Sequence, residues 1–126
     1  MNIAESELTI AKHANSDLMK SIPLMCELAQ TMLRDALDSF IHTNAALGIT
    51  VLQSDDTIDN ANRNLIKSVM EQMKQNPSMI ESGMELIRIS RNIERIADLA
   101  TNIAEEVIFI ADARLVKHST QTSSAQ

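Results

Sequence analysis

The sequence is poor in the residue types on which sheet packing, disulfides and tight turns depend. Its 126 residues contain two glycines, two prolines, two phenylalanines and one cysteine, and neither tryptophan nor tyrosine. Strand-forming residues never alternate with polar ones over a useful window, which argues against a β-sheet fold. The single cysteine, Cys26, cannot form an internal disulfide, as is typical of a cytoplasmic protein. These shortages predict an all-α protein.

Long apolar runs and basic faces are also missing. No run of about 18 apolar residues occurs, and the N-terminus lacks the charged-then-apolar layout of a signal peptide. The net charge is -6, and lysines and arginines gather on no face, which argues against a nucleic-acid or anionic lipid partner. The sequence also lacks a Gly-rich phosphate loop, a nucleophile elbow and a Cys-x-x-Cys pair. We therefore expect a cytoplasmic protein that is not inserted in a membrane.

Apolar residues spaced by three and four predict three amphipathic helices. The predicted helices cover residues 23–42, 45–74 and 77–115. The breaks at Thr43-Asn44 and Asn76-Pro77 are short and carry capping residues, so the helices are expected to form an antiparallel up-down-up three-helix bundle over residues 21–115. The eight methionines are expected to fill its core. The polar tail, residues 116–126, is interpreted as disordered.

Four acids interrupt the inner faces of the second and third predicted helices: Asp55 and Asp59 in one, Glu94 and Asp98 in the other. In an antiparallel hairpin, residues equally distant from the bend lie at one level. Asp55 is as far before Asn76-Pro77 as Asp98 is after it, and Asp59 matches Glu94 in the same way. Four carboxylates at one level repel one another, and hard or borderline cations with oxygen ligands would remove that penalty. The spacing therefore makes a metal site one hypothesis.

The same acids have a second interpretation, as solvated side chains at the rim of the helix interface that pair with Arg63, Arg91 and Arg95. The three histidines lie far from the acids by count, and no Glu-x-x-His motif is present, which argues against a ferritin-like di-iron oxidase. The residues alone thus leave three classes open: a partner-binding regulator, a carboxylate-bridged metal store or metalloenzyme, and a plain helical assembly module.

The third predicted helix carries two specific runs, RNIERIAD over residues 91–98 and ATNIAEEV over residues 100–107. Together with residues 32–40 of the first helix and 55–59 of the second, they resemble the PhoU family of phosphate-signalling regulators. The resemblance covers about residues 2–111. Asn2–Glu5, NIAE, recurs at residues 102–105. Residues 1–20 are therefore interpreted as a helix remnant and linker from a preceding repeat, with Asn2–Glu5 as the last turn of that repeat's third helix.

PhoU-like proteins consist of two tandem three-helix bundles, similar in outline to spectrin repeats, whose E/D-x-x-x-D motifs can hold multinuclear iron or zinc. The resemblance implies that the chain corresponds to the second bundle and that Asp55, Asp59, Glu94 and Asp98 are the ligand positions. Asn44 is a departure, because the family usually has an aspartate there.

The resemblance also implies a function. The chain would be a non-enzymatic negative regulator of phosphate uptake and phosphate-starvation signalling. Its partners would be the ATPase subunit of the phosphate ABC transporter and the sensor histidine kinase of the phosphate response, and through them it would lie at the inner membrane. Because a single bundle leaves uncovered the face that its partner bundle would contact, we also expect a homodimer or larger oligomer.

Overall fold

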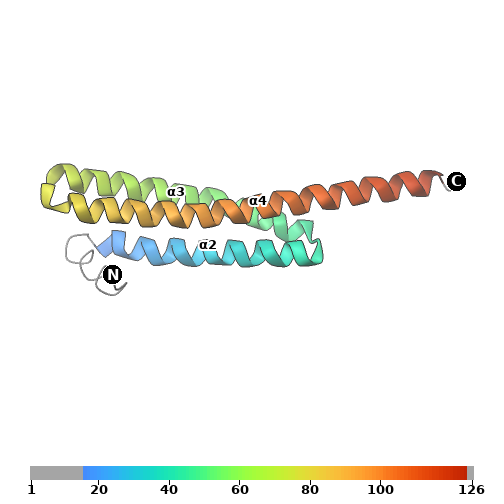
Figure 1. The fold of residues 1–126 in the computed structure, drawn as a ribbon, viewed down its shortest axis with the longest axis horizontal. Coiled ribbons are helices and arrows are strands. Elements are labelled where there is room, and N and C mark those ends of the chain that lie inside the picture. The colour runs from blue at the N-terminus through green and yellow to red at the C-terminus, as the bar shows by residue number, and fades with distance from the viewer. Residues whose placement is uncertain (1–15, 125–126) are drawn as a thin grey trace.

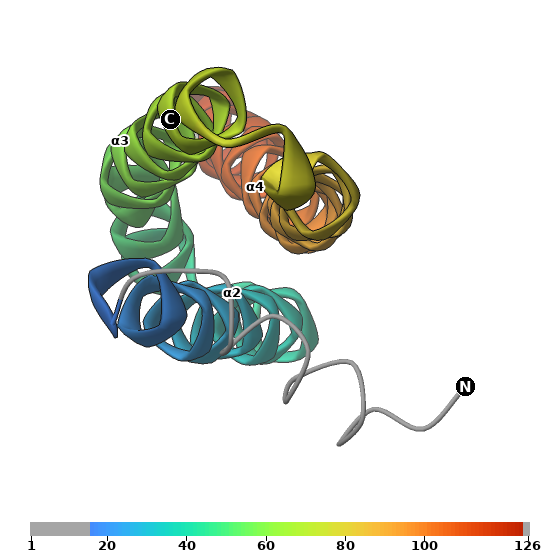
Figure 2. The same ribbon diagram turned by 90° about the vertical axis from the view of Figure 1, so that its left-hand side faces the viewer.

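The described part of the chain folds into a bundle of three α-helices. The structure is a computed structural model that describes residues 16–124, and these contain three α-helices, one 3-10 helix and no strand. In chain order the elements are α2 (Ser16–His42), α3 (Ala45–Gln75), η1 (Pro77–Met79) and α4 (Ile80–Ser124). Figure 1 shows α3 running back beside α2 and α4 running forward again, and Figure 2 shows the helices around one interior. The predicted up-down-up three-helix bundle is confirmed.

Small side chains let the three helices approach closely without aromatic residues. Five alanines in the core have no exposed surface: Ala29, Ala36, Ala97, Ala100 and Ala104. Larger side chains fill the spaces between them, and the largest that are fully buried include Met32 from α2, Ile58 from α3 and Leu86 from α4. The interior is thus close-packed from alanines and larger aliphatic and methionine side chains.

The expectation that methionines fill this core is correct only in part. Met25, Met32 and Met79 are buried, whereas Met70 and Met84 are 48% and 61% exposed. Alanine, which the helical pattern also placed on the inner faces, takes five of the fully buried positions of the core.

The bend between α2 and α3 is a Schellman motif with an unusual residue. The N–H of Asn44 donates to the carbonyl of Ser39 at 2.8 Å, and the N–H of Thr43 donates to the carbonyl of Phe40 at 3.3 Å. Thr43 has a φ of 49°, in the left-handed region that favours glycine. Asn44 then caps α3, because its Oδ1 accepts from the N–H of Leu47 at 3.1 Å.

The bend between α3 and α4 forms at the predicted Asn76-Pro77 pair. The Oδ1 of Asn76 accepts from the N–H of Ser78 at 3.2 Å, and its own N–H donates to the carbonyl of Gln72 at 2.9 Å. Pro77 stands in the first turn of η1, where its missing N–H leaves no bond unmade. This bend fixes the register of α3 against α4, and therefore the positions of the acids.

Two helix ends differ from the prediction. α2 begins at Ser16 rather than near Pro23, because Leu18 is buried against Leu65, Val69 and Leu86, and this packing extends the helix. Pro23 thus lies inside α2, where it removes one backbone hydrogen bond.

The second difference concerns the tail. α4 continues to Ser124 rather than ending near Leu115, so the expected disorder of residues 116–126 is wrong as far as Ser124. Residues 111–124 contain neither glycine nor proline to stop the helix, and the prediction gave too much weight to their polarity. In Figure 1 this part of α4 projects beyond α2 and α3.

The predicted remnant and linker, with the repeat at Asn2–Glu5, lies mostly outside the described residues, and residues 16–20 of it belong to α2. In the part of the chain that the structure describes, none of the helices has a stretch both long and apolar enough to cross a bilayer.

Candidate functional site

The structure brings the four predicted acids together where α3 faces α4. Asp55 and Asp59 come from consecutive turns of α3, and Glu94 and Asp98 from consecutive turns of α4. The negative charges of Asp59 and Asp98 lie close enough to repel the carboxylate of Asp55. The charges of all three aspartates repel the carboxylate of Glu94 in the same way. Asp55, Asp59 and Glu94 are half-buried, and Asp98 is exposed. The register set at the Asn76-Pro77 bend accounts for this arrangement.

Two of these carboxyl groups hold their protons more tightly than usual. Burial, followed by the charges of Asp59, Asp98 and Asp56, raises the pKa of Asp55, and a side-chain hydrogen bond with Asp59 adds to the rise. Burial, followed by the charges of Asp59, Asp98 and Asp55, raises the pKa of Glu94. Both effects disfavour the ionised form, so the cluster has an unfavourable density of negative charge.

Asp55 also has an unsatisfied atom. Its Oδ1 is buried and has no hydrogen-bond partner. A buried carboxylate oxygen without a partner loses its hydration and gains nothing in return. Such an oxygen is suited to accept a proton or a cation.

None of the described arginines forms an ion pair with the four acids, contrary to the second interpretation. Among the side chains that the structure describes, the one ion pair joins Arg88 and Glu85, a turn apart on α4. Arg63 donates from Nη1 to Asn60 Oδ1 at 3.4 Å, and it lowers the pKa of Glu94 only as the last of the contributions. Arg91 and Arg95, which are exposed, share with Glu94 and Asp98 an open pocket of about 210 Å³.

A buried amide supports Glu94 from the interior. Asn62 donates from Nδ2 to Oε2 of Glu94, and its Oδ1 accepts a hydrogen bond from the hydroxyl of Ser90. Ser90 has no exposed surface, and Asn62 is 9% exposed. Sequence reasoning assigned neither residue a role. The signal was present, because Asn62 occupies an inner-face position of α3 between Ile58 and Leu65, where the helical pattern requires an apolar residue.

The cluster offers mainly carboxylate oxygens to a ligand. It includes four carboxylates and one amide, and no thiol, imidazole or nucleophile belongs to it. In the described part of the chain, no three histidine, cysteine, aspartate or glutamate side chains converge closely enough to hold a metal ion in their present conformations. Metal binding by the four acids would therefore need side-chain rotation, and it stays a prediction.

The sequence is similar to known proteins along most of its length. The model of the family described as PhoU domain matches residues 22–107. No solved structure gives a significant match to the chain.

Three curated relatives carry the same description, phosphate-specific transport system accessory protein PhoU homolog. The one from Burkholderia sp is 33% identical over 99 residues, which are 79% of this chain and 42% of the relative. That from Pseudomonas putida is 36% identical over 89 residues, 71% of this chain and 35% of the relative. That from Aquifex aeolicus is 33% identical over 117 residues, 93% of this chain and 53% of the relative. The chain thus spans about half or less of the length of these relatives.

Proposed function

Because the chain belongs to the PhoU domain family, we propose that it is an accessory regulator of phosphate transport that works by binding other proteins. The observation that carries this proposal is the family match over residues 22–107, which ends where the last buried residue of α4, Val107, meets the bundle. An acidic site without a nucleophile agrees with a role other than catalysis.

The proposed partners are the ATPase subunit of a phosphate ABC transporter and the sensor histidine kinase of the phosphate response. Binding to them would repress phosphate uptake and the starvation programme when phosphate is plentiful, and it would hold the chain in the cytoplasm beside the inner membrane. The relatives are described as accessory proteins of phosphate-specific transport, which supports a transporter component as partner.

The acidic cluster is proposed to hold iron or zinc as part of this role. Asp55, Asp59, Glu94 and Asp98 would be the ligands, and the unpartnered Oδ1 of Asp55 supports the fit. A ligand set made of carboxylates suits a hard or borderline cation. The bound cation would supply positive charge that cancels the repulsion between α3 and α4. A carboxylate-bridged metalloenzyme is the alternative, and turnover with added iron, manganese or zinc would favour it.

Self-association is also part of the proposal, since large apolar side chains such as Leu24 and Leu99 are more than half exposed on the bundle surface. Sedimentation at high protein concentration is expected to show a dimer or larger species. A strict monomer would remove this element and leave partner binding unaffected.

The test is co-purification of the full chain from its native host under phosphate-replete conditions. We expect transporter ATPase and sensor kinase to accompany the wild type, and the double variant Glu94→Ala/Asp98→Ala to recover less of both. Glu105→Ala/Glu106→Ala, which removes two exposed acids further along α4, is the matched control. Elemental analysis of the same samples, purified without chelators, reports on iron and zinc. If the wild type recovers neither protein, the proposed regulation is wrong.

A further inference from the structure

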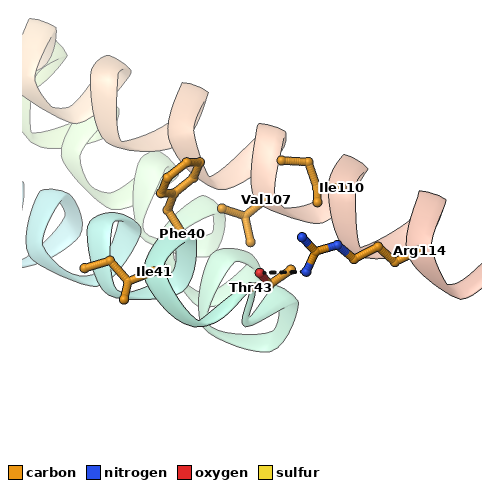
Figure 3. Close-up of a pocket in the computed structure, with 6 residues that line it drawn as sticks. All are labelled: Phe40, Ile41, Thr43, Val107, Ile110 and Arg114. Atoms are coloured by element: carbon orange, nitrogen blue, oxygen red, sulfur yellow. Dashed lines mark hydrogen bonds between the residues drawn. The ribbon is translucent and has the colours of Figure 1, made fainter.

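A pocket of about 290 Å³ opens between the last turn of α2 and the part of α4 that leaves the bundle. It is lined by Phe40, Ile41, Thr43, Val107, Ile110 and Arg114. Figure 3 shows Phe40 reaching towards α4, with Val107 and Ile110 pointing back from α4 towards the end of α2. Val107 is nine residues beyond Asp98, about 13 Å along the helix, so this pocket is separate from the acidic cluster.

Four of the six residues that line the pocket are apolar, and the pocket is open to solvent. Phe40 is 54% exposed and Ile41 is 69% exposed. Exposed apolar side chains grouped around a hollow mark a surface that another molecule covers. The volume is at the lower limit for small-molecule sites, which start at roughly 300 Å³, and it suits one large side chain.

Arg114 adds a fixed positive charge to the rim. Its Nη1 donates to Oγ1 of Thr43 at 3.2 Å, as the dashed line in Figure 3 shows. The side chain is exposed, and the bond to Thr43 is its one hydrogen bond to the side chains that the structure describes. A guanidinium group held by one bond, with donors to spare, is prearranged to bind a carboxylate.

We propose that this pocket is the docking site for an amphipathic helix of a partner protein, which inserts one large apolar side chain and places a carboxylate one turn away on Arg114. The apolar walls provide the contact area, and the charge of Arg114 selects an acidic segment, as in other helix-in-groove complexes. The inference rests on the proposed function, because it assigns the surface by which the chain would hold its phosphate-transport partner.

A second copy of the chain fits this pocket poorly. The exposed aromatic side chain that a second copy could insert is Phe109, which is 69% exposed and has Glu105 one turn before it. At about 100° per residue, Phe109 lies roughly 200° around α4 from Val107 and faces away from the pocket. Two copies joined through Phe109 and the pocket would continue head to tail instead of closing into a dimer. A different protein is therefore the occupant that the geometry favours.

The experiment measures binding of the purified full chain to the purified transporter ATPase and to the cytoplasmic part of the sensor kinase. Arg114→Glu reverses the charge on the rim, and Ile110→Glu places a charge in the pocket. Lys67→Glu makes a like change on the exposed side of α3, and Phe109→Glu alters the opposite face of α4. We expect both pocket variants to bind at least about tenfold more weakly, and both controls to bind like the wild type. Circular dichroism checks folding, and if Ile110→Glu loses helicity, the exposed Arg114 carries the test.

The outcomes separate this inference from the proposed function. If the wild type binds neither protein, both are wrong. If it binds and both pocket variants bind equally well, the function is supported and the docking site is overturned. The docking site is also overturned if Phe109→Glu alone abolishes binding. If sedimentation shows that Ile110→Glu removes self-association while partner binding persists, the pocket binds a second copy and the docking site is overturned. It is likewise overturned if the wild type binds only to vesicles of anionic lipid.

Discussion

Asn62 on α3 donates a hydrogen bond from its side-chain amide to Oε2 of Glu94 on α4, at the level where the four acids meet. The same amide accepts from Ser90, which is wholly buried. A polar group in an apolar interface is costly unless its bonds are made, and here both are made. The bond therefore links the candidate site to the core, because any ligand of Glu94 acts on a side chain held by the bundle interior.

Replacing this amide by its isosteric acid tests the link. Asn62→Asp keeps an acceptor for Ser90 but removes the donor to Glu94 and adds a negative charge beside it. We expect the free energy of unfolding at pH 7 to fall by about 1–3 kcal/mol, measured by urea denaturation. In the Glu94→Gln background the loss should be much smaller, because the glutamine amide can donate in its place.

Asn60→Asp is the matched control, since Asn60 is exposed on the same helix. Its effect should stay within about 0.5 kcal/mol. Equal losses for Asn62→Asp with and without Glu94 would show that the two side chains are not coupled.

The raised pKa values of Asp55 and Glu94 predict a bundle that becomes more stable as the pH falls from neutral. Burial and then the charges of neighbouring acids cause both shifts. With a raised pKa in the folded state, each group takes up its proton at a higher pH when folded than when unfolded. The free energy of unfolding therefore increases as the pH falls through the folded-state pKa, until the unfolded chain is protonated as well, at about pH 4. Urea midpoints between pH 7 and pH 4 measure this increase.

Substitution identifies the groups responsible for this pH dependence. Asp55→Asn should raise stability at pH 7 and flatten the slope, whereas Asp38→Asn, at an exposed acid on α2, should leave the slope unchanged. A stability that decreases as the pH falls from 7 to 5 would contradict the pKa shifts.

Much of this architecture could be predicted from the sequence, because it depends on local rules. Three-and-four spacing of apolar residues gives the helices, and the bend at Asn76-Pro77 sets which residues of α3 and α4 lie level. The meeting of Asp55 and Asp59 with Glu94 and Asp98 follows from that register alone. Whether a cation joins them is chemistry that spacing does not determine.

Other features depend on tertiary contacts and could not be predicted from the sequence. Asn62 looks like a defect in an apolar stripe until Ser90 and Glu94 are seen on the facing helix. The early start of α2 depends on the burial of Leu18 by two other helices. The pocket near Arg114 depends on how the last turn of α2 packs beside α4, and the spacing of apolar residues within each helix does not determine this.

The left-handed Thr43 should be a point of strain in the bend between α2 and α3. At a φ of 49°, the branched side chain of Thr43 makes unfavourable steric contacts with the backbone. Glycine has no side chain and avoids these contacts. We expect Thr43→Gly to raise the free energy of unfolding by about 1 kcal/mol, seen as a higher thermal midpoint. The lost bond from Arg114 is exposed and offsets little of this gain.

The same change one residue earlier is the control. His42 is the last residue of α2, so His42→Gly should lower stability by up to about 1 kcal/mol. If Thr43→Gly also lowers the stability, the hydrogen bond from Arg114 to the hydroxyl of Thr43 stabilises the bundle by more than the backbone strain at Thr43 destabilises it.

The two glycines of the chain should respond oppositely to alanine. A Cβ at Gly83 would lie 2.6 Å from Sδ of Met73 and 3.0 Å from Cγ1 of Val69, whereas at Gly48 the nearest atom would be the carbonyl oxygen of Ala104 at 3.3 Å. Alanine gains about 1 kcal/mol of helix propensity at either position. At Gly83 overpacking costs about 1–3 kcal/mol, so Gly83→Ala should destabilise the bundle, while Gly48→Ala should be neutral or stabilising.

Removing the obstructing side chain reverses the expectation at Gly83. In a Met73→Ala background the Cβ has room on that side, so Gly83→Ala should stabilise that variant by up to about 1 kcal/mol relative to its parent. Urea denaturation of the four combinations gives the coupling between the two positions. If Gly83→Ala stabilises the bundle even with Met73 present, the thioether swings aside without cost, and the close approach of α3 to α4 at Gly83 is looser than these distances imply.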